Sequence, residues 1–562
     1  MNSTLRGVWL TLLLIAASQL LCAQPTPATG SAASPAEAAG TIEEEAAGRL
    51  RAQVEYARRL IAEHHVDPPP DDALVRSAIK KMLRSLDPHS TFFSREEWEQ
   101  FRTRQNSLYS GIGAAMGERA GDVYIIAPQK NSPADRAGMR YGDRIVSVNG
   151  QPVAGWSLNQ VTNALLGEEK TPVTISVSRA GEQEALRFEL VRATLPRPSI
   201  SSVFLLPGKI GYVRMNRGFN TTTYGELSLA IRELRDREMK GLILDLRGNG
   251  GGLVEQAWRV ANVFLRKGQT IVSIGGRAPK YARRELPAYN PSPDESPLVV
   301  LIDRDTASSS EIVAGALQDQ ERALIVGENS FGKGLVQTTT EMADGSALIM
   351  TTGKYLTPSG RLIQRPYRSG LAYDYFHRLE TSEAAGEAGV FLTASGRHAA
   401  GGGGIRPDIV VSVDAGKASE REQWFDSIFL FVRDWLAKRI AEAPAAADER
   451  PTACEFYEEQ MAEARIGAGE LGAFASFLRR RPDLGMNPES APSHAELIGR
   501  QIRRELATAR CGQEAAWRVF VESDEVVQRA LQAMPRAGAL AEDYRRGQSV
   551  RQEDRKQGVE NR

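Results

Sequence analysis

The chain has 562 residues, which is enough for several domains at roughly 100–200 residues each. Its 70 basic residues equal its 70 acidic residues, so the sequence lacks the strong basic excess of a nucleic-acid-binding protein. The hydrophobic content of 42% is ordinary for a globular protein.

The N-terminus has the pattern of an export signal. Arg6 precedes an apolar run from Val8 to Leu21, and the small residue Ala23 follows. We expect a signal peptide over residues 1–23, because the run is shorter than the roughly 20 apolar residues of a membrane span. An uncleaved inner-membrane anchor and a lipoprotein acylated at Cys22 are the alternatives. The expected location is the periplasm.

Residues 24–103 change character along their length. Residues 24–41 are rich in Pro, Ala, Ser and Gly, which predicts a flexible linker. Residues 42–103 show helical spacing of apolar residues, interrupted by DPPPDD. The segment ends in SLDPHSTFF, where we interpret His89 as part of a structural turn and not as a catalytic residue.

Residues 104–192 resemble a PDZ domain. The resemblance rests on SGIGA, on AGMRYGDRIVSVNG with its turn glycines, on the helical pattern SLNQVTNALL and on a strand with alternating Val173, Ile175 and Val177. PDZ domains hold the terminal carboxylate of a peptide on backbone N–H groups of a glycine-bearing loop. The resemblance assigns that loop to Gly111, Ile112 and Gly113.

Residues 193–416 alternate between strand and helix patterns, which predicts an α/β core. One strand leads into the glycine-rich turn of LDLRGNGGG. Such a turn at a helix start can bind an anion, but it lacks the Lys-Ser/Thr of a nucleotide-binding P-loop. An irregular insert occupies residues 365–397.

The most informative stretch runs from Pro297 to Gln337. An apolar strand pattern leads to a turn and helix that begin near Ser308, and a second strand leads to the loop FGKG with Lys333. A serine hydroxyl needs a base to become a nucleophile. The GxSxG motif of Ser-His hydrolases is absent here, so a desolvated Lys333 is the candidate base, with Gln337 close enough to hold its amine.

TASSSEIVAGALQD followed by GENSFGKGLVQ resembles the C-terminal processing peptidases (tail-specific proteases), which are serine endopeptidases with a Ser-Lys dyad. The resemblance implies a crotonase-like core, Ser308 as nucleophile, Lys333 as general base and Gln337 as its assistant. It assigns the oxyanion hole to Gly251, Gly252 and the N–H of Ser309. The choice of Ser308 over Ser309 and Ser310 rests on the family alone, which commonly has SASASE where this chain has TASSSE.

Residues 417–544 show a helical pattern with an apolar stripe, and residues 545–562 mix charges without one, which predicts a disordered tail. An exported chain with Cys454 and Cys511 invites a disulfide, although the sequence leaves their pairing open. We therefore expect a multidomain α/β and α+β protein: a helical N-terminal region, a PDZ domain, a peptidase core and a helical C-terminal region.

The predicted function is endoproteolysis of proteins selected by their free C-terminal tails. Protein or peptide substrates are the expected partners, with room for an adaptor or regulatory protein, and no nucleic acid, cofactor or metal is expected. One alternative is a PDZ-bearing Ser-His-Asp protease. The other is a non-catalytic or regulated PDZ scaffold that binds C-terminal peptides.

Overall fold

The computed structural model describes residues 35–105, 107–367, 375–376, 389–412, 415–443, 454 and 466–560. They belong to two units, Met1–Ala78 and Ile79–Arg562, and each is described by itself. The predicted signal peptide, residues 1–23, and residues 24–34 of the predicted linker lie outside the described residues. No helix among the described residues is long and apolar enough to cross a membrane.

The first unit holds helix α1 (Pro35–His64) and the first part of α2 (Asp71–Arg84). Residues 35–41 of the predicted linker are therefore helical, because Pro35 suits the first turn of a helix and Ala and Glu follow it. The DPPPDD segment separates α1 from α2, as its prolines predict. Asp71 and Asp72 lie in the first turn of α2, where negative charge stabilises a helix.

The PDZ region of the second unit is a twisted antiparallel sheet with the strand order β3-β4-β5-β7-β8. Alternate residues of β7 (Pro172–Ser178) are buried against helix α5 (Leu158–Leu165), as the period-two pattern predicted. The other strands are β3 (Ala114–Arg119), β4 (Asp122–Pro128), β5 (Arg144–Val148), β6 (Gln151–Pro152) and β8 (Leu186–Val191). A ribbon of β2 (Leu108–Gly111) and β9 (Ala193–Pro196) leads from this region to the core.

The core is built on a six-stranded sheet with the order β10-β11-β12-β15-β16-β21. Its strands are β10 (Ser202–Leu206), β11 (Ile210–Arg214), β12 (Gly241–Asp245), β15 (Leu298–Ile302), β16 (Leu324–Gly327) and β21 (Ile409–Val410). All neighbours pair in parallel except β10 with β11. The carboxyl ends of β12, β15 and β16 therefore lie at one edge of the sheet, where open α/β sheets bind ligands.

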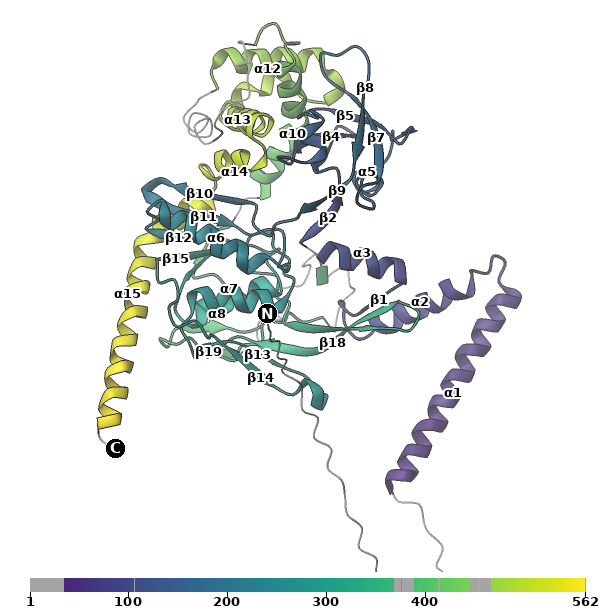
Figure 1. Ribbon diagram of the computed structural model, residues 1–562, viewed down its shortest axis with the longest axis vertical. Coiled ribbons are helices and arrows are strands. Elements are labelled where there is room, and N and C mark those ends of the chain that lie inside the picture. Colours follow the sequence, from purple (N-terminus) through teal and green to yellow (C-terminus); the bar gives the residue numbers. More distant parts are fainter. Residues whose placement is uncertain are drawn as a thin grey trace, which may run out of the picture. The chain divides into compact units, whose positions relative to one another are not determined.

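Helices cover both faces of this sheet, which explains why its strands are continuous apolar runs. One face, with Leu244 and Val300, packs on α6 (Thr223–Asp236), α7 (Val254–Phe264) and α8 (Ser309–Asp319). The other face, with Ile243 and Val299, packs on α15 (Glu525–Glu560), which runs along the sheet in Figure 1.

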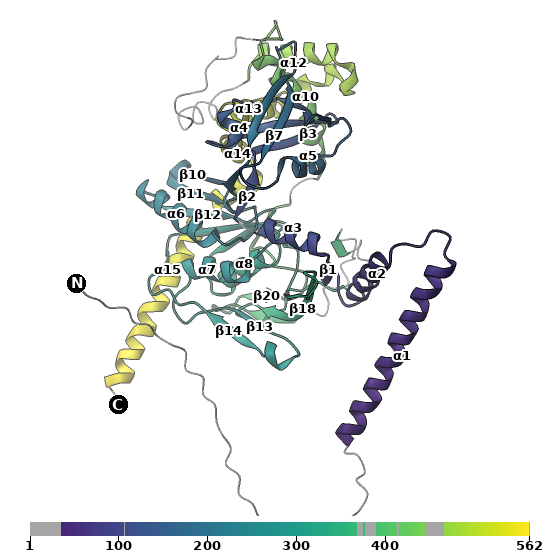
Figure 2. The ribbon, with the colours of Figure 1, turned by 45° about the vertical axis from the view of Figure 1, so that its right-hand side comes forward.

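A second, antiparallel sheet lies next to α7 and α8 (Figure 2). Its order is β1-β18-β13-β14, and β17 also pairs with β18. The strands are β1 (Thr91–Phe93), β13 (Thr270–Gly275), β14 (Arg284–Pro287), β17 (Leu335–Glu341) and β18 (Ala347–Leu356). Because β1 pairs with β18, the segment that precedes α3 (Arg95–Gln105) is part of the core.

The C-terminal region contains α10 (Ala415–Leu436), α12 (Ala468–Arg480), α13 (Ala495–Cys511), α14 (Gln513–Val521) and α15. The predicted disordered tail is wrong for residues 545–560, which continue α15. The residues there are mostly Arg, Gln, Glu and Lys, which are good helix formers and extend a helix that is already nucleated. Cys454 and Cys511 form a disulfide. The expected multidomain fold class is confirmed.

Candidate active site

Ser308 lies at a sharp turn between β15 and α8. Its backbone has φ 56° and ψ −116°, a left-handed conformation that costs a residue with a side chain about 1–3 kcal/mol. The turn is fixed by Asp303, whose carboxylate accepts the N–H groups of Asp305 at 3.0 Å and Thr306 at 2.9 Å. Such strain at the carboxyl edge of a sheet is typical of a functional residue.

The three adjacent serines have different environments. Ser309 and Ser310 are buried, and their hydroxyls donate to the carbonyls of Gly252 at 2.8 Å and Asn249 at 2.9 Å. Ser308 is partly exposed, and unlike its two neighbours its hydroxyl does not donate to a carbonyl of the glycine turn. Among the three hydroxyls, Ser308 Oγ is therefore the one available to a substrate.

Lys333 lies in the loop that joins β16 to β17. Its Nζ donates to Gln337 Oε1 at 3.0 Å, and Gln337 Nε2 donates to the carbonyl of His89 at 2.7 Å. Burial lowers the pKa of Lys333, against the opposing charges of Glu311 and Asp87. Among the described residues Nζ makes no hydrogen bond to Ser308 Oγ; such contacts often tighten only when substrate binds.

Glu311 joins the serine turn to the lysine loop. Its buried carboxylate accepts the N–H groups of Ser308 at 2.7 Å, Gly332 at 2.7 Å and Lys333 at 2.9 Å. It also accepts the hydroxyl of Ser330 at 2.5 Å. Burial raises the pKa of Glu311, while these four hydrogen bonds oppose that effect.

Tyr355 supports the same two segments through their carbonyls. Its hydroxyl lies 2.7 Å from the carbonyl oxygen of Lys333 and 3.1 Å from that of Ser308. Neither Tyr355 nor the role of Glu311 was predicted from the sequence. For Glu311 a signal existed, because an acid in the third position of a helix is typical of a contact with the backbone at the helix start. Tyr355 carried no comparable signal.

The glycine turn after β12 approaches the serine turn. A Cβ on Gly251 would lie 2.8 Å from Ser308 Cβ. The N–H of Gly251 donates to Asn249 Oδ1 at 2.9 Å, so in this structure it already has an acceptor. Within the part of the chain that the structure describes, the N–H groups of Gly252 and Ser309 have no acceptor. These two amides are available to a developing oxyanion.

Two family models and several relatives match this chain. A model of Peptidase family S41 matches residues 209–375, and a PDZ domain model matches residues 124–179. The carboxy-terminal-processing protease of Bartonella bacilliformis is 37% identical over 304 residues, which cover 53% of this chain and 69% of that protein. The chain belongs to the carboxy-terminal-processing proteases. It is a serine-type peptidase that acts on peptide or protein substrates.

Two further relatives show how much of the chain the similarity covers. The carboxy-terminal processing protease CtpA of Bacillus subtilis is 37% identical over 300 residues, 52% of this chain and 62% of that protein. The solved structure of a photosystem II D1 C-terminal processing protease has 31% identity and a TM-score of 0.34, and the match covers 62% of this chain and 85% of that chain. The alignments with the two bacterial relatives thus span about half of this carboxy-terminal-processing protease.

The predicted carboxylate loop of the PDZ region follows β2. Gly111, Ile112 and Gly113 are buried, and Gly113 has φ 75°. A Cβ on Gly113 would lie 2.3 Å from Ser132 Cβ, so the close packing requires glycine. The N–H groups of Ile112 and Gly113 donate to no acceptor among the described residues.

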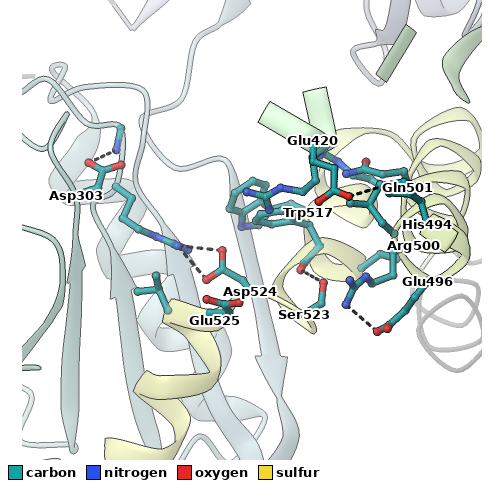
Figure 3. Close-up of a pocket in the computed structure, with 18 of the residues that line it drawn as sticks. Asp303, Glu420, His494, Glu496, Arg500, Gln501, Trp517, Ser523, Asp524 and Glu525 are labelled. Carbon is teal, nitrogen blue, oxygen red and sulfur yellow. Dashed lines mark hydrogen bonds and ion pairs between the residues drawn. The ribbon is translucent and has the colours of Figure 1, made fainter. Parts of the chain in front are cut away.

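A cavity of about 560 Å³ lies between the core and the C-terminal helices (Figure 3). Charged residues line it, and several of them are paired: Arg247 with Asp524 at 3.0 Å, and His494 with Glu420 at 2.8 Å. Ser308, Lys333 and Gln337 do not line it. We therefore do not place the peptidase reaction in this cavity.

Proposed function

We propose that this carboxy-terminal-processing protease is an exported endopeptidase that cuts proteins selected by their C-terminal tails. Ser308 is the nucleophile, and Lys333 is the general base. The observation that carries the proposal is the partly buried Lys333 amine, which Gln337 holds on a loop that Glu311 ties to the partly exposed Ser308.

The reaction begins when neutral Lys333 takes the proton of Ser308 Oγ. Oγ attacks the scissile carbonyl, and the N–H groups of Gly252 and Ser309 stabilise the oxyanion. The Lys333 ammonium protonates the leaving amine, which gives an acyl-enzyme, and water activated by the same lysine releases it. The depressed pKa of Lys333 supports this role, because only the neutral amine accepts a proton.

The PDZ region supplies tail selection. β3 lies at the edge of its sheet, so a peptide can add to it as a further strand, with its terminal carboxylate on the N–H groups of Ile112 and Gly113. The walls beside β3 are apolar: Ala114 and Met116 pack with Leu158 and Val161 of α5. Apolar tail residues therefore fit this groove better than charged ones.

Export to the periplasm is supported by two features. The N-terminal residues have the signal-peptide pattern, and the Cys454–Cys511 disulfide suits an oxidising compartment. Inner-membrane association follows only if the signal segment is retained. An adaptor or regulatory protein that presents substrates is a compatible partner.

The test compares the wild type with Ser308→Ala and Lys333→Ala on one unfolded protein with an apolar C-terminal tail. The same substrate with a charged tail is the control. We expect cleavage by the wild type alone, and faster cleavage of the apolar tail. Cleavage by Ser308→Ala would place the nucleophile elsewhere, and a silent wild type would favour the scaffold function.

A further inference from the structure

A short turn from Asp87 to Ser90 lies beside the proposed catalytic lysine. Asp87 Oδ1 accepts the N–H groups of His89 and Ser90, both at 2.8 Å, and Asp87 Oδ2 accepts the Ser90 hydroxyl at 2.6 Å. Asp87 and Ser90 are buried. Three hydrogen bonds to one buried carboxylate fix the direction of the peptide groups in this turn.

The carbonyl of His89 determines how Gln337 is oriented. A carbonyl can only accept, so it holds the Nε2 side of the Gln337 amide at 2.7 Å. The opposite side, Oε1, must then face Lys333 Nζ, which donates to it at 3.0 Å. An amine that donates one N–H to Gln337 keeps its lone pair for the proton of Ser308.

The turn is attached to the sheet that carries Gln337. Ser90 Oγ accepts the N–H of Thr351 in β18 at 3.0 Å, and β17 has a register irregularity between Val336 and Gln337. Irregularities of this kind redirect a side chain and are frequent beside active sites.

The ring of His89 fastens the turn on its other side. His89 Nε2 lies 2.8 Å from the hydroxyl of Tyr375. Burial, together with the charges of Lys333 and Arg365, lowers the pKa of His89 to about 4, against the opposing charge of Asp87. The ring is therefore neutral at neutral pH. His89 was predicted to be part of a structural turn, and it contacts Gln337 through its backbone carbonyl and not through its ring.

We infer that the Asp87–Ser90 turn is a positioning element of the catalytic centre, which orients Lys333 through the His89 carbonyl and the Gln337 amide. The inference rests on the proposed Ser308–Lys333 reaction. It makes the segment directly after α2 part of the peptidase apparatus. Asp87 and His89 are positioning residues, since neither bonds to Ser308.

A double-mutant cycle tests the inference. Asp87→Ala in the otherwise wild-type protein should lower kcat about 10- to 100-fold with little change in KM, because misplacement of a catalytic group typically has effects of this size. In the Gln337→Ala background the same change should lower kcat less than about twofold, because residues that act through one another are not additive. The rate of Ser308 labelling by a fluorophosphonate, followed by mass spectrometry, keeps slow variants measurable.

Asp344→Ala is the matched control. Asp344 accepts the N–H of Ser346 at 3.0 Å and its hydroxyl at 2.6 Å, which makes a similar turn in the β17–β18 hairpin without contact to Gln337. Its labelling rate should equal that of the wild type. If Asp87→Ala lowered kcat by the same factor in the wild-type and Gln337→Ala backgrounds, the inference would be overturned. An inactive wild type would overturn the proposed function instead.

The variant Asp87→Asn allows a measurement, the pH profile, that a purely structural role of Asp87 would not change. The amide keeps an oxygen for the His89 and Ser90 N–H groups but removes a negative charge near Lys333, leaving Glu311 as the other acid that raises its pKa. Labelling at high pH should be retained, and the acidic limb of the pH profile should move to lower pH. The inference would be contradicted if the acidic limb of the Asp87→Asn profile did not move and its labelling rate equalled that of Asp87→Ala.

Discussion

At the scale of single residues, Glu311 is the residue on which the structure of the site depends most. Its carboxylate is an acceptor for four donors from two segments, so a neutral amide in its place would turn an N–H group toward other N–H groups. Buried polar groups that lose their partners cost about 1–3 kcal/mol each. The geometry of Ser308 and Lys333 therefore depends on a residue that need not touch substrate.

Glu311→Gln should lower the free energy of unfolding by about 3 kcal/mol and kcat by about 100-fold. Urea unfolding and tail cleavage measure the two effects. Glu255→Gln, which removes only an exposed pair with Arg259 on α7, should change neither by much. Wild-type stability in Glu311→Gln would show that the four hydrogen bonds contribute little.

Lys333→Arg tests whether the lysine must be neutral. Arginine keeps its proton at any working pH, so kcat should fall about 1,000-fold, within the usual contribution of a general base. In the wild type, kcat/KM should rise with pH as Lys333 loses its proton, and burial places this rise below the ordinary lysine pKa of 10.5. A wild-type profile that is flat on its acidic side down to pH 5 would argue against Lys333 as the base.

At this scale the sequence indicates candidate residues but not their contacts. Ser308, Lys333 and Gln337 were assigned because their motifs are local and specific. Gly251 was assigned as a donor from the family resemblance, and the sequence did not predict that the Asn249 side chain would accept the Gly251 N–H. The link from His89 to Gln337 joins residues 248 positions apart, and local patterns do not encode such a contact.

At the scale of elements, the PDZ region is held against the C-terminal helices. Tyr124 and Ile126 of β4 share an apolar cluster with Trp424 and Phe429 of α10. Arg433 of α10 donates to the carbonyl of Gly142 at 2.8 Å, and a Cβ on Gly142 would lie 2.8 Å from Arg433 Cγ. The apolar stripe on α10 thus packs against β4 of the PDZ region.

Tyr141→Phe should loosen this contact. The Tyr141 hydroxyl donates to buried Glu505 of α13 at 2.8 Å, and a hydrogen bond to a charged group is worth about 1.5–3 kcal/mol. Burial raises the pKa of Glu505, so the variant should lose most stability above that pKa, where the carboxylate is charged, and less as the pH falls and it gains a proton.

Chemical unfolding followed by tryptophan fluorescence at several pH values measures the effect. Tyr289→Phe is the control, because Tyr289 is 47% exposed. A loss that stays constant from acidic to alkaline pH would mean that Glu505 does not carry the effect.

Secondary structure was predictable where periodicity is strong, as in β7 and α5. The first and last helices were placed less well, because α1 begins inside a Pro- and Ala-rich segment and α15 continues through residues without an apolar pattern. Sheet order could not be predicted, since the pairing of β1 with β18 joins residues more than 250 positions apart.

At the scale of the whole molecule, the disulfide closes a large loop. Cys454 and Cys511 are 57 positions apart, and a bond across such a loop typically stabilises a fold by about 2–4 kcal/mol. The double variant Cys454→Ser with Cys511→Ser should unfold at a lower temperature by calorimetry. A reducing agent should bring the wild type to the same midpoint, and equal midpoints without reductant would show that the bond is not formed in solution.

The shared carboxylate of Glu311 has a consequence for how this enzyme can be switched off. If the serine turn moved while the lysine loop stayed, Glu311 would lose one set of partners and remain buried beside the other. A site in which only one of these two segments has moved therefore has a high free energy. The two loops should move together when the enzyme passes between its competent and incompetent states. A regulator that binds either loop would then control both. The enzyme would switch between two states and would not respond in a graded way.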